Sequence, residues 1–518
     1  MQQPTFSGAL ADARAPIRAR WIVALLLIYG ALWLLVHGGS ALVPPMDNIE
    51  QLIWVRKLAW GYYKHPPLTT MLLWPLVQLF GLHGWVTYVL GATLTLGALG
   101  LLWWLLRRMC DSRFATLALL AMLCITNIGG RLHFYNHNTT LLLFTVLSGV
   151  FAWLALEQRR WHWWALLGLS LGAGALAKYQ IGLSVAALLL VWWRARGWTD
   201  PVQLGGLLLA GAISMAVFAP HAWWQWQHGS EAVDYALTTS VAAGEAGLRG
   251  VAGSVLWLVE QLLTRGILSG LLLGWGVWQW RRRVRAEGQP ATGRVGESRP
   301  VQAPVSPAFF LLAWGGLPLL LMLLMGLLFG SVLQRHWGVA YLPAFMAGAM
   351  LLARRIDWPA VLARPVLRVF IVLQALLMLQ VVLTSSYGLS SFRNRAWRNF
   401  DAARVAAAMA PQVHQVLGGP VHVLIGPSKE TGAISLNLPE RPLVLLSNNY
   451  RWSPWVPQDL VARCGAVTIE VEYRNAAALA PVAAPAVGGR IENLGGGIHA
   501  VQWTVQPAQP GQQPCPAL

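Results

Sequence analysis

The sequence WIVALLLIYGALWLLVHGGSALV, from Trp21 to Val43, decides the fold class of this chain. An apolar run of this length can cross the hydrocarbon core of a bilayer as one helix. Arginines precede it within residues 1–20 and no clear small-residue cleavage site ends it, so it differs from a secretory signal peptide. We interpret it as an uncleaved anchor, with residues 1–20 in the cytoplasm.

Comparable apolar runs recur along the chain. Of 518 residues, 56% are hydrophobic and 11% are charged, whereas roughly 25% are charged in an ordinary soluble domain. The mean hydropathy is +0.51. This composition excludes a water-soluble enzyme and predicts an α-helical polytopic membrane protein. We predict about eleven spans, at residues 21–43, 82–106, 114–130, 139–156, 162–178, 180–194, 202–220, 266–281, 306–330, 338–353 and 366–384.

Basic residues dominate the charge but do not gather on one soluble surface. The formal charge is +18, from 38 Lys and Arg against 20 Asp and Glu, and many arginines lie between apolar runs. Nucleic-acid binding would need them on a single face, so we exclude nucleic acid as a partner. The positive-inside rule instead places the arginine-rich loops, including a linker at residues 281–305, in the cytoplasm and the C-terminus outside.

Two apolar segments do not fit a simple span. Residues 68–80 (LTTMLLWPLVQLF) are short and contain Pro75, so we predict that they lie at the interface. Residues 250–265 contain Glu260 and Arg265, and these charges favour a helix that lies on the membrane surface.

The composition changes near Ser385. Hydrophobic runs shorten to strand length (VHVLI, PLVLL, VTIEVEY), with Pro, Gly and Asn between them. After a membrane module at residues 21–384, we therefore predict a soluble α/β domain at residues 385–518, outside the cytoplasm. An oxidising compartment would permit a bridge between Cys464 and Cys515, although two cysteines alone do not decide it.

The first outer loop, residues 44–81, carries the leading catalytic candidate. Asp47 and Glu50 are three positions apart and would share one face of a helix. A carboxylate beside the hydrocarbon boundary is costly unless it is paired or used, which makes Asp47 a candidate functional group. Asp47 could instead cap the helix that follows it, and the two roles can coexist.

The second outer loop, GGRLHFYNHNTT at residues 129–140, concentrates polar side chains. Groups such as Arg131, His133 and His137 suit phosphate oxygens, while Asn side chains and aromatic rings suit sugars. The loop is therefore either an anion or sugar site or a hydrated connection with an aromatic belt. The spacing of His133 and His137 also suits a metal, but no carboxylate or cysteine accompanies them, so we predict no metal site.

Other outer loops add basic and aromatic groups. Lys178 is either an interfacial anchor or a ligand for a lipid phosphate. His221 in PHAWWQWQHG, and Arg335 with His336 in LQRHWGVAYLP, lie on the same side. Tryptophans at such positions are more often belt residues than ligands.

Together the outer loops offer carboxylates, cations and aromatic rings beside a membrane. This set fits transfer of a sugar from a lipid-linked phosphate, because a carboxylate can accept the acceptor's proton and cations can stabilise the departing phosphate. No nucleotide-binding GxxxxGK loop occurs, which agrees with such a donor. A transporter or flippase of lipid-linked sugars is the rival interpretation, but no internal repeat supports it.

One stretch carries a family resemblance. An anchor run, then MDNIEQ, then WGYYKHPPL at residues 60–68, resembles bacterial members of glycosyltransferase family 39. These include aminoarabinose and galacturonic acid transferases of lipopolysaccharide and, more distantly, protein O-mannosyltransferases. GALAKYQ, PHAWWQW and RHWGVAYLP are weaker signposts of the same group, and the resemblance covers residues 20–355. It implies a GT-C fold and an inverting transfer from a polyprenyl-phosphate sugar.

The resemblance also implies roles for individual residues. Asp47 matches the acidic catalytic position, and the role of Glu50 is open. Lys64 and His65 stand where many relatives have Glu-Lys, and in aminoarabinose transferases that Glu helps to bind a metal. Its absence argues against a divalent metal at that position and leaves a divalent metal elsewhere open. The expected catalytic residues are Asp47 and Glu50, the expected lipid-phosphate or donor ligands are Lys64, His65, Arg131, Lys178 and Arg335, and the expected sugar or acceptor ligands are Tyr62, Tyr63, His133, His137, His221 and His336.

We therefore predict a multi-pass glycosyltransferase of the bacterial inner membrane with its active site facing the periplasm. Its partners would be an undecaprenyl-phosphate sugar, a glycolipid acceptor and the lipid bilayer. Lipid A or lipopolysaccharide core is the expected acceptor, and a protein or polymer acceptor is the alternative.

Overall fold

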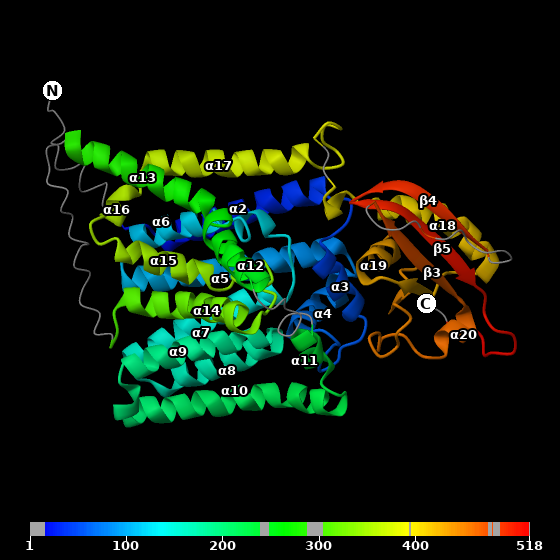
Figure 1. Cartoon of the computed structure of the whole chain (residues 1–518), viewed down its shortest axis with the longest axis horizontal. Helices are drawn as coiled ribbons and strands as arrows, with labels where there is room; N and C mark the ends of the chain where they lie inside the picture. The colour runs from blue at the N-terminus through cyan, green and yellow to red at the C-terminus, as the bar shows by residue number, and fades with distance from the viewer. Residues whose placement is uncertain are drawn as a thin grey trace.

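A computed structural model describes residues 16–238, 248–286, 304–392, 395–474, 479 and 487–516. Long helices run side by side as a bundle, and a sheet domain lies at one end of it (Figure 1). We call this the sheet-domain end. Most of the predicted cytoplasmic N-terminus and of the linker, residues 1–15 and 287–303, lies outside the described residues.

The bundle combines long helices with short connecting ones. The longer helices are α2 (Ala19–Ser40), α5 (Gly84–Met109), α7 (His137–Gln158), α8 (Trp161–Ala177), α9 (Gly182–Arg194), α10 (Pro201–Gln227), α13 (Ile267–Ala286), α14 (Pro307–Phe329) and α17 (Arg364–Leu383). The shorter helices are α3 (Met46–Trp54), α4 (Leu68–Phe80), α6 (Ser112–Leu123), α11 (Glu231–Ala236), α12 (Leu248–Val259), α15 (Leu342–Leu352) and α16 (Trp358–Val361). Single turns are η1 (Gly129–Arg131), η2 (Tyr179–Ile181) and η3 (Gly197–Thr199), and η5 (Glu260–Thr264) is π-helical.

Each predicted span contains one helix of the bundle. In the described part of the chain, 6 helices are long and apolar enough to cross a bilayer, and the bent pair of α12 and α13 makes up to 7. The prediction of an α-helical polytopic membrane protein is confirmed. The predicted span count is approximate, because other apolar helices of the bundle are shorter than a full crossing.

Helix α6 shows how a short helix is accommodated in the bundle. Nearly all of its side chains are buried by neighbouring helices, so its length does not have to match the bilayer. The predicted span at 114–130 is therefore too long. The helix ends at Leu123, and residues 124–131 form turns that lead to Arg131 at the sheet-domain end.

The segment at 250–265 is joined to the next helix. Helices α12 and α13 meet at a bend of 45°, and the π-helical turn η5 lies between them. Arg265 donates a hydrogen bond to Glu260 across this turn. The two charges that suggested a surface helix therefore pair with each other at the bend.

The C-terminal domain is α/β, as predicted. Its sheet has the order β2-β1-β3-β5-β4, in which β1 is parallel to β2 and β3, and β5 is antiparallel to β3 and β4. The three strand-length runs in the sequence correspond to β1, β2 and β3. The elements are η6 (Trp397–Asn399), α18 (Ala402–Leu417), β1 (Val423–Gly426), α19 (Ser428–Asn437), β2 (Leu443–Leu446), α20 (Leu460–Cys464), β3 (Ala466–Tyr473), β4 (Val487–Gly495) and β5 (Ile498–Gln506).

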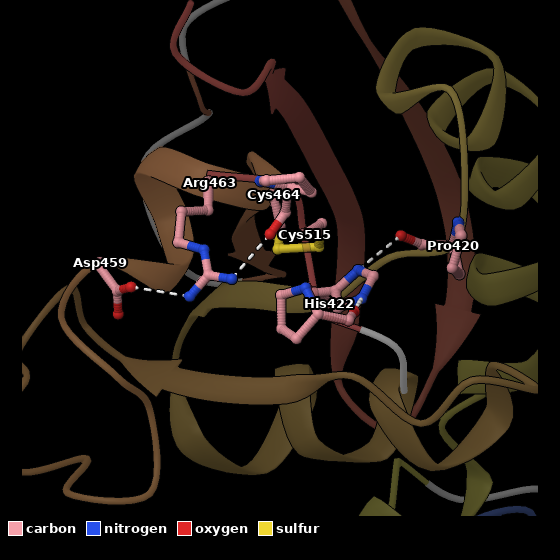
Figure 2. The surroundings of a disulfide bond; sticks show 8 residues. Pro420, His422, Asp459, Arg463, Cys464 and Cys515 are labelled. Atoms are coloured by element: carbon pink, nitrogen blue, oxygen red, sulfur yellow. Dashed lines mark hydrogen bonds and ion pairs between the residues drawn. A yellow bond between two sulfur atoms is a disulfide. The ribbon is translucent and has the colours of Figure 1, made fainter. Parts of the chain in front are cut away.

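A disulfide bond fixes the C-terminal tail to this domain. Cys464, the last residue of α20, is bonded to Cys515. Figure 2 shows Arg463 beside the bridge, where it donates to the carboxylate of Asp459 at 3.0 Å and to the carbonyl of Pro514 at 2.7 Å. The bridge that the sequence left open is present in the structure.

Helix α19 joins the C-terminal domain to α3 (Figure 1). Gly432 on α19 faces Ile49 and Ile53 of α3, and a Cβ atom at Gly432 would lie 2.5 Å and 2.7 Å from their side chains. Only a glycine allows this close approach. The backbone N–H of Leu42 also donates to the carbonyl of Arg398 at 2.8 Å. The domain is thereby fixed next to the helix that carries Asp47.

Candidate active site

Asp47 lies in the first turn of α3, at the sheet-domain end of the bundle (Figure 1). The predicted capping role is wrong, because Pro45 is the N-cap residue and no side chain caps this helix. Asp47 Oδ2 instead accepts a hydrogen bond of 2.7 Å from Nδ2 of Asn136. The exposed carboxylate therefore faces the second outer loop.

Asn136 is oriented by its place at the start of α7. Its Oδ1 accepts hydrogen bonds of 3.0 Å from the backbone N–H groups of Asn138 and Thr139, as Asn often does at a helix N-cap. Because Oδ1 is used in this way, Nδ2 is directed to Asp47. The same turn presents Oδ1 of Asn138, which accepts from Nζ of Lys178 at 2.7 Å.

Lys178 follows the last residue of α8 and turns into the protein. Besides its bond to Asn138, its ammonium lies 5.6 Å from the ring centre of Trp337. These inward contacts favour a ligand role over that of an interfacial anchor. Asp47 and Lys178 are thus connected through the two asparagines at the N-terminal turn of α7.

Glu50, one helical turn after Asp47, forms an ion pair with Lys64, and its Oε1 lies 2.6 Å from Nζ. Burial alone would lower the pKa of Lys64, but the carboxylate outweighs burial and holds this pKa above its ordinary range. Burial also raises the pKa of Glu50, and the ammonium opposes that rise. The pair ties the WGYYKHPPL stretch to α3 beside Asp47.

The residues at the implied metal position do not fit a divalent cation. Lys64 stands where the resemblance implies a metal-binding Glu, and its ammonium, paired with Glu50, would repel a metal there. In the described part of the chain, one group of three His, Cys, Asp or Glu side chains has metal-ligand geometry, namely His422, Cys464 and Cys515. The two cysteines of that group form the disulfide.

His65, the residue after Lys64, packs against His137, with ring centres 4.0 Å apart. Nδ1 of His137 lies 3.0 Å from the carbonyl oxygen of Ala177, so this nitrogen carries the proton and Nε2 accepts from Gln51 at 3.1 Å. Burial lowers the pKa of His65 well below its ordinary value. At neutral pH His65 is therefore an uncharged group, not a cation for a phosphate.

Two of the sequence signposts meet in the structure. Nδ1 of His221, from PHAWWQW, lies 2.5 Å from the carbonyl oxygen of Trp60, and its Nε2 lies 2.7 Å from the hydroxyl of Tyr179. Next to this contact, a Cβ atom at Gly61 would lie 2.4 Å from the ring of Trp224. His221 is fully buried and has partners at both nitrogens, so it holds α10 against the first loop.

The two tyrosines of WGYYKHPPL have different surroundings. Tyr62 is buried and stacks on Trp54 at 4.6 Å between ring centres, so it belongs to the packing of the loop. Tyr63 stacks on Trp452 of the C-terminal domain at 4.9 Å, and its ring also lies 5.2 Å from the ammonium of Lys64. The sheet domain thus contributes a side chain next to the site.

A second contact joins the C-terminal domain to the segment between α10 and α11. Arg451 forms an ion pair with Glu231 of α11 and donates to the carbonyl of His228 at 3.0 Å. The turn that presents Arg451 is closed by Asn449, whose Oδ1 accepts from the backbone N–H of Arg451 at 2.9 Å. Sequence reasoning missed this contact, because nothing local in the tail indicates which loop it meets.

The ring of His133 packs against α2. Its ring centre is 3.4 Å from that of His37 on α2, and its carbonyl accepts from Asn48 at 2.9 Å. Burial lowers the pKa of His133 well below its ordinary value, so it is uncharged at neutral pH. His133 and His137 thus have different partners and do not converge on one point.

A hollow lies beside Asn136 and Asn138. Its volume is about 40 Å³, which is below the range of about 300–1,000 Å³ that is typical of small-molecule sites. Its lining residues are Thr95, Asn127, Ile128, Arg131, Phe134, Asn136, Asn138, Thr139, Leu142, His336 and Val339. The structure therefore brings two predicted ligands, Arg131 and His336, into one cavity next to the partner of Asp47.

The bend at η5 supplies further charge near this hollow. Glu260 pairs with Arg265, and its second oxygen lies 3.6 Å from Nε of Arg335. Burial lowers the pKa of His336, and the nearby positive charges lower it further, so this ring is uncharged at neutral pH. Arg265 was missed as a site residue, because its sequence context indicated only a surface helix.

Known proteins share parts of this arrangement. Residues 64–224 match the family described as dolichyl-phosphate-mannose-protein mannosyltransferase. Over 196 residues the chain is 24% identical to the lipid A galacturonosyltransferase RgtD of Rhizobium johnstonii, and the match spans 36% of this chain and 40% of that protein. The fold is similar to that of ArnT from Cupriavidus metallidurans bound to undecaprenyl phosphate, with a TM-score of 0.59 and 14% identity over 94% of this chain and 98% of ArnT.

The chain has a GT-C fold. The apo structure of ArnT gives a similar result, with a TM-score of 0.56 and 15% identity over 87% of this chain and 92% of ArnT. The predicted resemblance to bacterial glycosyltransferase family 39 is confirmed. Within the GT-C fold, the family match begins at Lys64 and includes the second outer loop, Lys178 and His221.

Proposed function

We propose that this chain is a glycosyltransferase of the bacterial inner membrane that takes its sugar from a polyprenyl phosphate. The observation that carries the proposal is the Asp47 carboxylate, held by Asn136 beside a hollow that Arg131 lines. We further propose that the site faces the periplasm and that the acceptor is lipid A or lipopolysaccharide core. The names of the relatives support these assignments, since ArnT was crystallised with undecaprenyl phosphate and RgtD is a lipid A galacturonosyltransferase.

In the proposed reaction Asp47 is the general base. The acceptor hydroxyl attacks the anomeric carbon, its proton passes to Asp47, and the bond between that carbon and the phosphate oxygen breaks. The bonding electrons leave with the polyprenyl phosphate. Attack opposite the phosphate inverts the configuration. Asn136 holds Oδ2 of Asp47, so we assign Oδ1 to the acceptor hydroxyl.

Cations stabilise the charge that develops on the departing phosphate. Lys178 is the leading candidate, because it is linked through the asparagines to Asp47 and forms no ion pair among the described residues. Burial lowers the pKa of Lys178 to about 7, so an anionic phosphate beside it would favour its charged form. Arg265 and Arg335 lie nearby at the η5 bend. His65 and His336 are uncharged, so they contribute hydrogen bonds and shape instead of charge.

The test is transfer by the purified full-length chain in liposomes that contain a polyprenyl-phosphate sugar and lipid A. We expect Asp47→Asn to lower the rate about 100- to 10,000-fold, the usual range for a positioned general base. Asp459→Asn, an exposed carboxylate of the C-terminal domain, is the matched control and should keep the rate. Retained transfer by a well-folded Asp47→Asn protein would contradict the assignment.

The acceptor is tested in cells. Mass spectrometry of envelope glycolipids from cells that lack the protein should show loss of a sugar-sized mass from lipid A or core. The wild-type chain should restore that mass and Asp47→Asn should not. Unchanged glycolipids throughout would overturn the proposed acceptor.

A further inference from the structure

The disulfide of the C-terminal domain lies beside a buried histidine (Figure 2). One ligand atom each of His422, Cys464 and Cys515 lies within 4.8 Å of the other two. His422 is 7% exposed and Cys464 is 6% exposed, whereas solvent reaches Cys515. Two sulfur atoms and an imidazole are ligands that thiophilic metal ions prefer, once the sulfurs are thiolates.

Both ring nitrogens of His422 face carbonyl oxygens. Nδ1 lies 3.0 Å from the oxygen of Pro420, and Nε2 lies 2.9 Å from the oxygen of Pro516. A neutral imidazole has one N–H group, so it can donate to only one of these carbonyls. The other nitrogen then directs its lone pair at an oxygen atom, which is an unfavourable contact. A metal ion bound to that nitrogen would remove the mismatch.

The contact with Pro420 gives His422 the orientation of a metal ligand. A histidine that binds a metal almost always donates its second N–H to a carbonyl, a carboxylate or water, which fixes the ring and its tautomer. Nδ1 of His422 would donate to the carbonyl of Pro420 in this way. We assign Nε2 to the metal, because it faces Pro516, the residue that follows Cys515.

Other bonds keep the two cysteines together when the disulfide is opened. The side chain of Arg463 donates to the carbonyl of Pro514 at 2.7 Å, and the backbone N–H of Gln509 donates to the carbonyl of Ala462 at 2.8 Å. The Cα atoms of the two cysteines are 5.0 Å apart. Two thiolates on one tetrahedral zinc ion lie about 3.8 Å apart, since each Zn–S bond is about 2.3 Å long. Rotation of the two side chains can reach this separation without moving the backbone.

We infer that His422, Cys464 and Cys515 form a binding site for a thiophilic metal ion, zinc or copper(I), when the disulfide is reduced. The inference does not depend on the proposed transferase function. The disulfide closes the site, because each sulfur is then bonded to the other. The site therefore opens only on reduction.

A dithiol supplies the two electrons for this reduction. One of its thiolates attacks Sγ of Cys515, which solvent reaches, and Sγ of Cys464 leaves as a thiolate. The second thiolate of the reductant then displaces Sγ of Cys515 from the mixed disulfide, and the reductant leaves as its own disulfide. The metal binds both cysteine thiolates and Nε2 of His422, and the two protons of the dithiol pass to solvent.

The test is zinc binding by the full-length chain in detergent, before and after reduction by a phosphine that is then removed. We expect the reduced chain to bind one more zinc ion than the oxidised chain. Cys110 and Cys124 are free in both states, so any zinc on them cancels in the comparison. Cobalt(II) in place of zinc should give the charge-transfer absorption of a thiolate complex. Competition between zinc and copper(I) then identifies the preferred ion.

Three variants test the ligands. His422→Gln keeps both cysteines and should weaken zinc binding by at least about 100-fold, since loss of a mere outer-shell partner costs 10- to 100-fold. The double variant Cys464→Ser with Cys515→Ser should bind no additional zinc. His499→Gln is the matched control, because His499 of β5 lies near Glu472 at 3.7 Å, and it should bind zinc like the wild type. Equal zinc binding by the oxidised and reduced chains, or unchanged binding by His422→Gln, would overturn the inference.

Hydrogen–deuterium exchange covers the case in which reduction loosens the domain. Peptides from residues 507–516 should exchange faster in the reduced chain without metal, because the bridge no longer holds them. Zinc should restore their protection in the wild-type chain and in His499→Gln, but not in His422→Gln. A reduced wild-type chain whose tail stays unprotected in zinc would also overturn the inference, since a metal bound to all three residues must hold the tail.

Discussion

Glu50→Gln removes one charge of the ion pair that holds the WGYYKHPPL loop against α3. Oε1 and Nζ lie 2.6 Å apart, and the side chains of Glu50 and Lys64 are 11% and 23% exposed. Removing one partner of a fully buried pair costs roughly 3–5 kcal/mol. Because solvent still reaches Lys64, we expect about 2–3 kcal/mol here. This corresponds to an increase of about 30- to 150-fold in local opening.

Hydrogen–deuterium exchange of the full-length chain in detergent measures this opening at peptides from residues 46–67. The set comprises Glu50→Gln, Lys64→Met and the double variant, which together form a double-mutant cycle. The double variant should be at least about 1 kcal/mol more stable than the sum of the single changes, because it leaves no unpaired buried charge.

Asp459→Asn is the matched control for the cycle. Asp459 lies 3.0 Å from Arg463, but its side chain is 56% exposed. An exposed pair contributes little to stability because solvent screens it, so exchange near Asp459 should rise less than about 6-fold. If the cycle is additive, or if the buried and exposed changes have equal effects, the ion pair does not hold the loop and the reasoning is refuted.

Three further outcomes are expected. Arg451→Glu should open the contact with Glu231 and weaken donor affinity about 2- to 5-fold in transfer assays, because an exposed ion pair contributes about 1 kcal/mol or less. The charge-swapped double variant with Glu231→Arg should restore the affinity, and no restoration would rule out a role for the contact. Reducing the disulfide, which spans a separation of 51 residues, should destabilise the C-terminal domain by about 4 kcal/mol in hydrogen exchange, and a change below about 1 kcal/mol would show that the tail is held by its other bonds. Gly61→Ala should lower stability by about 1–3 kcal/mol in thermal unfolding through overpacking, whereas Gly97→Ala, where a Cβ meets nothing within 4 Å, should not.

Local patterns in the sequence were sufficient to predict the class of protein. Apolar runs near the thickness of a bilayer predict spanning helices, because the cost of leaving backbone polar groups in hydrocarbon acts on each segment separately. Local sequence patterns also predicted that Asp47 and Glu50 share one helix and that an α/β domain follows the helical bundle. These predictions depend on residues that are close in the chain.

The sequence predicted the lengths and ends of individual helices less accurately. The span at 114–130 was predicted too long, because α6 is surrounded by protein and does not need to match the bilayer. The alternative capping role of Asp47 is wrong, because α3 begins at Met46, two residues earlier than a cap at Asp47 requires. Both errors arise where packing, not composition, decides where a helix starts or stops.

The sequence by itself determined a multi-pass helical protein with a C-terminal α/β domain and a set of polar loops between the apolar runs. Only the tertiary structure decided which side chains meet: Asp47 with Asn136, Glu50 with Lys64, and Tyr63 with Trp452 from the end of the chain. It also placed Asn127, which no pattern marks, in the wall of the hollow. Such contacts join segments far apart in sequence, and they depend on how helices pack around one another, which local periodicity does not encode.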